Sequence, residues 1–427
     1  MLNILIYSSL ILSLFYFSLR NRVDFLLVFF ISTVLYHWQI IYGTIIVPPY
    51  SFEVNDISKI IIMIVLITHL IITCIHDTIN NKNVLINIHD LKSYNRIAYV
   101  LCFISLFLTI KALYIVGYQF TYKDEYKNAL AENNISMIFT YYSSAMSLLF
   151  GILTRNRKLI ILSFLPLINY AYMGYRALFV VAIIGSITIS FYNTKLFSKK
   201  ILKLTSIIIL VFLFFSIQKV IYYEVKKTEN FSLKNHVEKI ISKDARYDNL
   251  NEYLKSIFFY SEFGQTSSNL TLSIDNELGK KYDFTTMLLG SIPFVKNFSD
   301  ISEDDVRFSR LIRNYANPGF SYGLASNVWG EAYAALGFFG VFLFSIIVSS
   351  TISVLNSVFF RKNIFYLFNI LFLSFLSFYI HRNDMTLIFA HIKNSVFLII
   401  CALLIVSFYQ LFLKILKINL EKKNICE

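Results

Sequence analysis

Long runs of apolar residues, rather than alternating apolar and polar positions, dominate the chain. Runs of roughly 17 to 25 apolar residues can cross a bilayer as one helix. Eleven candidate runs occur, at 2–19, 23–43, 57–76, 97–116, 136–153, 159–173, 177–192, 201–223, 328–354, 364–380 and 388–413. The pattern therefore predicts an all-α, polytopic integral membrane protein of about eleven transmembrane helices.

Basic residues gather in alternate connections between these predicted helices. Six such connections hold 18 Lys and Arg residues against five acidic ones. Connections rich in Lys and Arg stay in the cytoplasm, so the amino terminus is expected outside and the carboxyl terminus inside. Nine or thirteen spans would keep the same alternation. The first run lacks a basic leader and a cleavage site, which favours a retained span over a signal peptide.

Composition agrees with this interpretation and explains the charge. The chain is 56% hydrophobic and 15% charged, which excludes an ordinary soluble domain. Its formal net charge of +13 is accounted for by the predicted cytoplasmic connections, so the charge predicts no nucleic-acid partner. Three of the four cysteines fall inside predicted spans, and no cysteine spacing indicates a disulfide or a metal site.

One long polar insertion, 224–327, separates the predicted helices of 1–223 from those of 328–427. It holds 13 basic and 14 acidic residues, as expected of a nearly neutral segment outside the membrane. Apolar residues three and four apart predict one or two amphipathic helices in 234–260. A further helix is predicted over 303–315, where acids come early and arginines late.

Arginines of the insertion recur every third position, at Arg307, Arg310 and Arg313. On a helix they form one cationic stripe, here called the arginine ridge, whose guanidiniums suit phosphate or diphosphate oxygens. The alternative is a solvated face paired with the acids at 303–305, or a stripe that touches lipid headgroups.

Two further arginines lie in short connections on the predicted outer side. Arg176 falls between two apolar runs only about three residues apart, and Arg382 follows His381 in another tight turn. Charges held at the membrane surface without a loop are usually functional or paired. Snorkelling of these side chains to the headgroups is the alternative.

Glu331 stands at the outer mouth of the predicted span 328–354. Asn327 lies one helical turn earlier, and the small Ala334 and Ala335 would let a neighbouring segment approach closely. The carboxylate could instead be an ordinary acid at a helix start, where the helix dipole favours it. No glycine-rich phosphate loop, His-Glu-x-x-His motif or nucleophile elbow is present, and we expect neither a metal nor a cofactor.

The layout and the stretch "SYGLASNVWGEAYAALGFFG" (321–340) resemble the O-antigen polymerase family, the bacterial oligosaccharide repeat-unit polymerases. The resemblance also rests on an outer Gly-x-Arg turn at 174–176 and on the large outer loop. It implies an integral-membrane glycosyltransferase bundle in the bacterial inner membrane. The enzyme would join undecaprenyl diphosphate-linked oligosaccharides on the periplasmic face, in contact with membrane lipid and with a possible chain-length regulator protein.

The resemblance and the residue inventory together give the candidate site. Glu331 is the candidate base, with Arg176 and Arg313 as catalytic cations. Expected contacts with the diphosphate or the sugar are Arg307, Arg310, Arg382, His381, Asn327 and Tyr322.

Three other functions are weighed against polymerisation. The related O-antigen ligases share the layout, but here the large loop has a single histidine, His236. A flippase or exporter of lipid-linked glycans also needs a charged outer cavity, yet the internal repeats typical of such transporters are missing. A non-catalytic scaffold explains the apolar runs but not the arginines in tight outer turns.

Overall fold

The structure is a computed structural model of the 427-residue chain. It describes residues 2–47, 50–79, 95–117, 123–173, 175, 177–192, 194–196, 262–275, 282–291, 307–316, 326–358 and 366–425. The chain divides into two compact units. The first unit comprises Met1–Asn83, Phe191–Val358 and Leu373–His391; the second comprises Val84–Ser190, Phe359–Phe372 and Ile392–Glu427.

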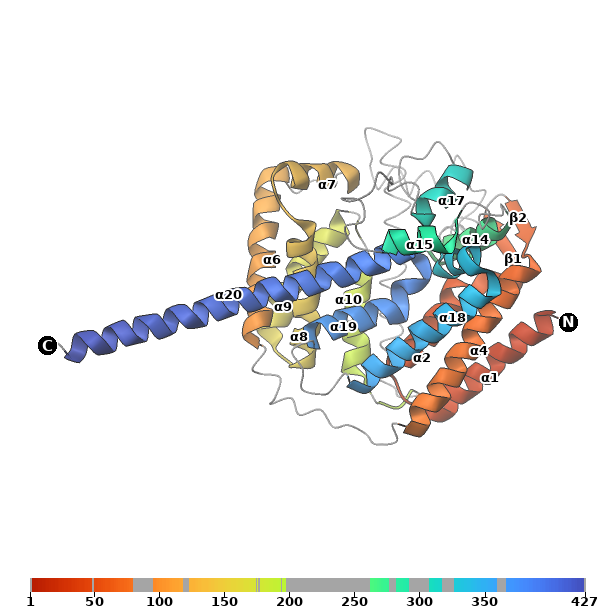
Figure 1. Cartoon of the computed structure of the whole chain (residues 1–427), viewed down its shortest axis with the longest axis horizontal. Helices are drawn as coiled ribbons and strands as arrows, with labels where there is room; N and C mark the ends of the chain where they lie inside the picture. The colour runs from red at the N-terminus through yellow and green to blue at the C-terminus, as the bar shows by residue number, and fades with distance from the viewer. Residues whose placement is uncertain are drawn as a thin grey trace, which may run out of the picture. The chain divides into compact units, whose positions relative to one another are not determined.

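Apolar helices form the body of the first unit (Figure 1). They are α1 (Leu2–Arg20), α2 (Phe25–Tyr36), α4 (Asp56–Ile79) and α18 (Val328–Val358). Helix α4 packs along both α1 and α18, and α2 contacts α4 and α18. Outward positions of α1, such as Ile11 and Phe15, are more than half exposed, as expected of a surface that meets lipid.

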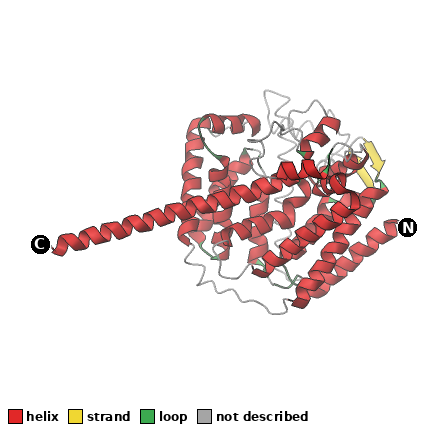
Figure 2. Cartoon of the chain, in the orientation of Figure 1, coloured by secondary structure: helices red, strands yellow, loops and turns green. Residues whose placement is uncertain are grey.

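At one end of this unit the chain is less regular. The short helix α3 (Trp38–Tyr42) leads into a hairpin of β1 (Thr44–Val47) and β2 (Tyr50–Glu53), the only strands among the described residues (Figure 2). Helix α14 (Glu262–Asp275) packs against α2, α3, β1, α4 and α18. Its buried face is mainly Ser, Thr and Asn, which explains why no hydrophobic pattern predicted it.

Helix α18 is broken near its start. Gly337 has φ 64° and ψ −152°, a conformation open to glycine but strained for other residues. Three residues later, a Cβ on Gly340 would lie 2.3 Å from the Ala332 carbonyl oxygen, so the break also needs a glycine there. Gly330 allows α14 to approach, because its Cβ would lie 2.6 Å from Ser273 Oγ. Each of these glycines therefore has a local structural reason.

The last third of the chain continues with α19 (Tyr366–Ser374), a π-helical turn η5 (Phe375–Tyr379) and a 3₁₀ turn η6 (Ile380–Arg382). Helix α20 (Met385–Ile425) follows. Two short helices from the insertion, α15 (Phe284–Ser291) and α17 (Phe308–Ala316), belong to the first unit. Helix α17 begins five residues later than the predicted start at 303, and 303–306 lie outside the described residues.

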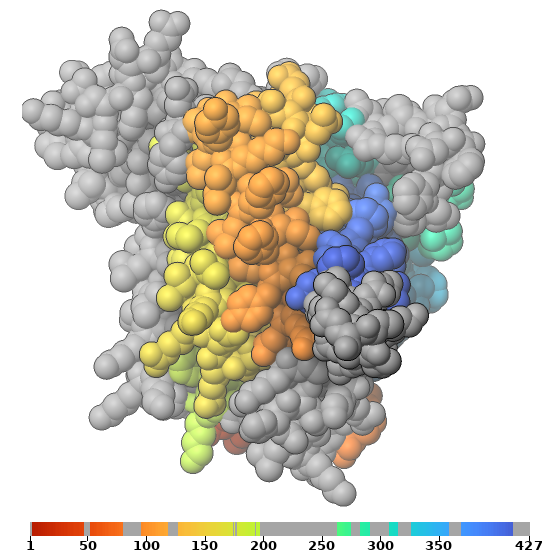
Figure 3. All heavy atoms as spheres, turned by 90° about the vertical axis from the view of Figure 1, so that its left-hand side faces the viewer, coloured from red at the N-terminus to blue at the C-terminus, as the bar shows by residue number. Residues whose placement is uncertain are grey.

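The second unit is a helical layer built on α8 (Ser143–Leu153), which contacts three neighbouring helices. Its other described elements are α6 (Asn95–Val116), α7 (Lys123–Glu132), η2 (Ile138–Tyr142), α9 (Arg157–Tyr172) and α10 (Ala177–Ser190). Small residues of α8 allow this close packing: Ser147 Oγ donates to the Ala98 carbonyl of α6 at 3.0 Å. Figure 3 shows α6 and α9 side by side on one face. Phe103 of α6 and Ile161 of α9 are exposed.

The prediction of an all-α membrane protein holds at the level of helices. Five helices are long and apolar enough to cross a membrane: Leu2–Arg20, Asp56–Ile79, Asn95–Val116, Val328–Ser357 and Met385–Phe412. Shorter apolar helices cover Phe25–Tyr36, Ile138–Leu153 and Ala177–Ser190. The predicted number of eleven spans is not confirmed. The three shorter apolar helices do not reach the length of the spans predicted at the same positions, and 201–223 lie outside the described residues.

Candidate functional site

Glu331 lies in the first turn of α18 and is completely buried. The helix start is fixed by Asn327, whose side-chain oxygen accepts from the backbone amides of Trp329 at 3.0 Å and Gly330 at 3.1 Å. Asn327 Nδ2 in turn donates to the Thr266 carbonyl of α14 at 3.2 Å. Asn327 is therefore a buried helix cap, which uses its polar atoms within the protein.

The carboxylate of Glu331 joins three segments that are distant in sequence. Its Oε1 accepts a short hydrogen bond from the Tyr282 hydroxyl, and its Oε2 accepts from the backbone amide of Met385 at 2.7 Å. Burial, and next the negative charge of Glu331, raise the pKa of Tyr282, so this hydroxyl stays protonated and remains a donor. Among the described residues, no Lys or Arg forms an ion pair with Glu331.

A second buried acid, Asp384, caps α20 beside it. Its Oδ1 accepts from the Leu387 amide at 2.9 Å. Its Oδ2 accepts from the Ser309 hydroxyl at 2.7 Å and more weakly from the Ser309 amide at 3.4 Å. Asp384 thus ties the beginning of α17 to the beginning of α20.

Helix α17 packs next to these acids on an apolar surface formed by Tyr282, Met287, Ala334 and Ala335, here called the seat. Phe308 and Ile312 are buried against Tyr282 and Met287, with Ala334 and Ala335 of α18 at the edge. The Tyr282 and Phe308 rings lie 5.0 Å apart, centroid to centroid. The two small alanines therefore allow a neighbouring segment to approach, and that segment includes the helix of the arginine ridge.

The arginine ridge is half-buried rather than fully solvated. Arg307 precedes α17 and its carbonyl accepts from the Arg310 amide at 2.9 Å. Arg313 donates twice to Asn314 Oδ1, at 3.1 and 2.9 Å. Arg382 is also half-buried, and its guanidinium donates to the Tyr379 hydroxyl at 2.7 Å. These four arginines belong to the same unit as Glu331.

His381 belongs to a buried polar network between α2 and α18. Trp329 Nε1 donates to His381 Nδ1 at 2.9 Å, and His381 Nε2 lies 3.0 Å from Ser32 Oγ of α2. Since His381 is completely buried, contact with a substrate would require it to be uncovered. Nearby, His37 Nε2 accepts from Asn327 Nδ2 at 3.1 Å.

A network of arginine–aspartate ion pairs lies near the carboxyl-terminal end of α18. Arg20 donates to both carboxylate oxygens of Asp24, at 2.8 and 2.5 Å, and to Asp77 at 2.7 Å. Arg22 forms a second ion pair with Asp77. Asn356, two residues before the end of α18, donates to Asp24 at 3.3 Å. Here each acid has an arginine partner.

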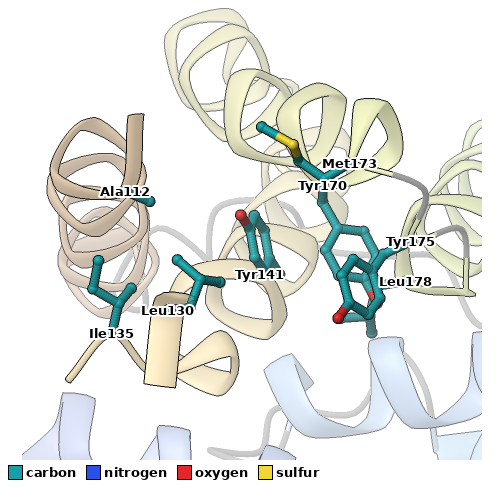
Figure 4. Packing of buried hydrophobic residues seen from close by; sticks show 8 residues of the cluster. All are labelled: Ala112, Leu130, Ile135, Tyr141, Tyr170, Met173, Tyr175 and Leu178. Carbon is teal, nitrogen blue, oxygen red and sulfur yellow. The ribbon is translucent and has the colours of Figure 1, made fainter. Parts of the chain in front are cut away.

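Two of the predicted site residues, Arg176 and Tyr322, lie outside the described residues, as do the predicted helices of 234–260. The neighbours of position 176 can be described. Tyr175 and Leu178 join a buried cluster of the second unit with Tyr141 and Tyr170 (Figure 4). The Tyr170 and Tyr175 rings stack with centroids 5.1 Å apart. The chain on both sides of Arg176 is thus held by aromatic packing.

The sequence offered no signal for Tyr282, the main partner of Glu331. Tyr282 is 49 positions away and lies in a stretch without clear periodicity. Asp384 was not among the predicted site residues, although an acid directly before a helix, here α20, is a recognisable cap signal. Within the described ranges, no three His, Cys, Asp or Glu side chains come together as metal ligands.

Comparison with known proteins gives no family for this chain. No family model matches it, and no match was found among curated proteins or solved structures.

Proposed function

We propose that this chain is a bacterial inner-membrane glycosyltransferase that polymerises undecaprenyl diphosphate-linked oligosaccharide repeat units. In this proposal it crosses the membrane eleven times, with its amino terminus in the periplasm and its carboxyl terminus in the cytoplasm. The observation that best supports the proposal is the way in which α17 packs on the first unit. The helix has a buried apolar side on Tyr282 and Met287, while three arginines on it or directly before it are only half-buried.

The proposed reaction requires fixed positive charge beside the diphosphate, which arginine side chains can supply. The growing glycan leaves its lipid diphosphate as a sugar hydroxyl of the next repeat unit attacks the anomeric carbon. Negative charge then develops on the diphosphate, and fixed guanidiniums stabilise such charge. In the proposal Arg310 and Arg313 bind this leaving group, assisted by Arg382. Arg176, which belongs to the second unit, stays a separate catalytic candidate.

The acceptor hydroxyl also has to lose a proton. Glu331 is the candidate base, but its two oxygens already accept from Tyr282 and Met385. A base has to come within hydrogen-bond reach of the proton it removes. Glu331 could serve as that base only if its carboxylate were uncovered.

A gel of surface polysaccharide tests the proposed function. We expect Arg176→Ala or Glu331→Gln to abolish long glycan chains while one repeat unit still reaches the lipid anchor. A complete ladder in both variants would refute the site. Loss of all surface glycan, including the single-unit product, would indicate a flippase instead. Polymer that accumulates on undecaprenyl diphosphate would indicate a ligase.

A second pair of variants tests the arginine ridge. Lysine keeps the charge but loses the planar pair of donors that grips two phosphate oxygens at once. We therefore expect Arg310→Lys and Arg313→Lys to shorten the glycan ladder. Normal ladders from both variants would show that bidentate recognition by the ridge is not required.

A further inference from the structure

The described contacts of Glu331 lead from its carboxylate to the arginine helix, rather than to a surface. Each carboxylate oxygen accepts from a group that touches or borders α17: the Tyr282 hydroxyl and the Met385 amide. Tyr282 packs on Phe308 in the first turn of α17. Met385 follows Asp384, which holds Ser309 of the same turn. Both paths therefore end at the beginning of α17.

We propose that Glu331 is a positioning residue: through Tyr282 and Met385 it holds the seat on which α17 presents the arginine ridge. The inference rests on the proposed function for the meaning of the ridge, but the seat itself can be tested without any glycan. It assigns Glu331 a different role from that of a base, which would have to reach the substrate.

The geometry favours this role in two respects. Glu331 and Tyr282 are both completely buried, so neither side chain is open to a sugar hydroxyl in this arrangement. In addition, the described partners of the carboxylate are donors, so it works as an acceptor that joins segments. Removal of either member of a buried pair leaves the other unsatisfied, which is costly and favours opening of the contact.

Cysteine labelling can follow the seating of α17 directly. Ile312 is 1% exposed and faces the seat. In a variant whose four native cysteines are replaced, Ile312→Cys should react slowly with a membrane-impermeant maleimide. We expect Glu331→Gln and Tyr282→Phe each to accelerate labelling by about tenfold. The glutamine amide offers one acceptor oxygen for the two donors, and phenylalanine has no hydroxyl to donate. The double variant should label no faster than the faster of the two single variants.

Asp56→Asn supplies the matched control. Asp56 is also an acid in the first turn of a long apolar helix of this unit, but its side chain is 77% exposed and paired with Lys59 at 3.5 Å. Labelling of Ile312→Cys should not change in this variant. An acceleration equal to that of Glu331→Gln would overturn the proposal, because it would reflect general loosening.

Two outcomes separate the positioning role from the proposed function. If Glu331→Gln abolishes the glycan ladder but leaves labelling unchanged, the positioning role is wrong and the base role gains support. If labelling accelerates while the ladder remains complete, the positioning role stands and the proposed polymerase site falls.

Trypsin provides a second readout should Ile312→Cys itself fail to fold. It cleaves after arginine, and α17 carries Arg310 and Arg313 in its native sequence. In the purified full-length protein we expect Glu331→Gln and Tyr282→Phe to accelerate cleavage at these two sites, and Asp56→Asn to leave it unchanged. Equal cleavage rates in all four proteins would refute the positioning role.

Discussion

The two ends of α18 bury acids in opposite ways. At the Asp24 end, arginines accompany the acids: the Arg20 and Asp24 side chains are 4% and 1% exposed and lie 2.5 Å apart. At the Glu331 end, the described partners of two buried acids are hydroxyl and amide groups. Removal of one partner of a buried ion pair destabilises a protein more than removal of one partner of a neutral hydrogen bond, since an unpaired buried charge remains. The Asp24 end therefore depends on paired charges, and the Glu331 end on hydrogen bonds from neutral donors.

The distance between these ends fits a membrane crossing. Glu331 and Asn356 are 25 positions apart, which at the helical rise is at most about 38 Å. That length exceeds the bilayer hydrocarbon of about 30 Å only slightly. By the charge of the connections, the Asp24 end is the predicted cytoplasmic one. The two kinds of acid site would then face different compartments.

The largest effect is expected at the Asp24 end. Asp24→Ala removes two of the three described hydrogen bonds of the buried Arg20 guanidinium and the cap of α2, so the free energy of unfolding should fall by about 3–5 kcal/mol. Denaturation in detergent micelles, followed by tryptophan fluorescence, measures this change. Asp24→Asn keeps a capping oxygen and should lose less. If Asp24→Asn is as stable as wild type, the loss in Asp24→Ala comes from the cap or from packing and not from the charge.

An intermediate effect is expected at the Glu331 end. Glu331→Ala leaves the Tyr282 hydroxyl and the Met385 amide without their acceptor, so the same measurement should show a loss of about 1–3 kcal/mol. Because no charge is stranded among the described residues, the loss should be smaller than that of Asp24→Ala. A larger loss would contradict the distinction between the two ends.

The smallest effect is expected from Asp283, an exposed acid next to Tyr282. It caps α15 by accepting from the Thr286 amide and hydroxyl, both at 2.7 Å, and the bond from the amide is the main cause that lowers its pKa. A lowered folded-state pKa adds stability at neutral pH, and this is lost as pH falls through that pKa. Asp283→Ala should therefore unfold slightly more easily than wild type at pH 7. The difference should vanish in acid, and a difference that grows in acid would exclude this cause.

The helices were predictable because hydrophobicity is a local signal. The run at 2–19 became α1, and the run at 57–76 became α4, within a few residues. The hairpin at Thr44–Glu53 was not predicted, because it lies between two long apolar runs, at 23–43 and 57–76, rather than within one. Helix α14 was missed because its buried face is polar and gains its partners only from other helices.

The sequence pattern singled out Glu331 and the arginine ridge, and their functional role stays a prediction. Both lie in the first unit. Their described connection runs through Tyr282 and Asp384, and it depends on contacts between positions 49 and 75 residues apart. A single sequence contains no local signal for such contacts, which arise only when α17 and α20 pack.

The glycine break in α18 also divides it into a short and a long helical segment. After Gly337 the helix runs from 338 to 358, a length of about 31 Å, which spans the hydrocarbon without help. The preceding stub, Val328–Leu336, is then not needed to cross the hydrocarbon. Glu331 lies on this stub, and groups of the protein itself enclose its carboxylate.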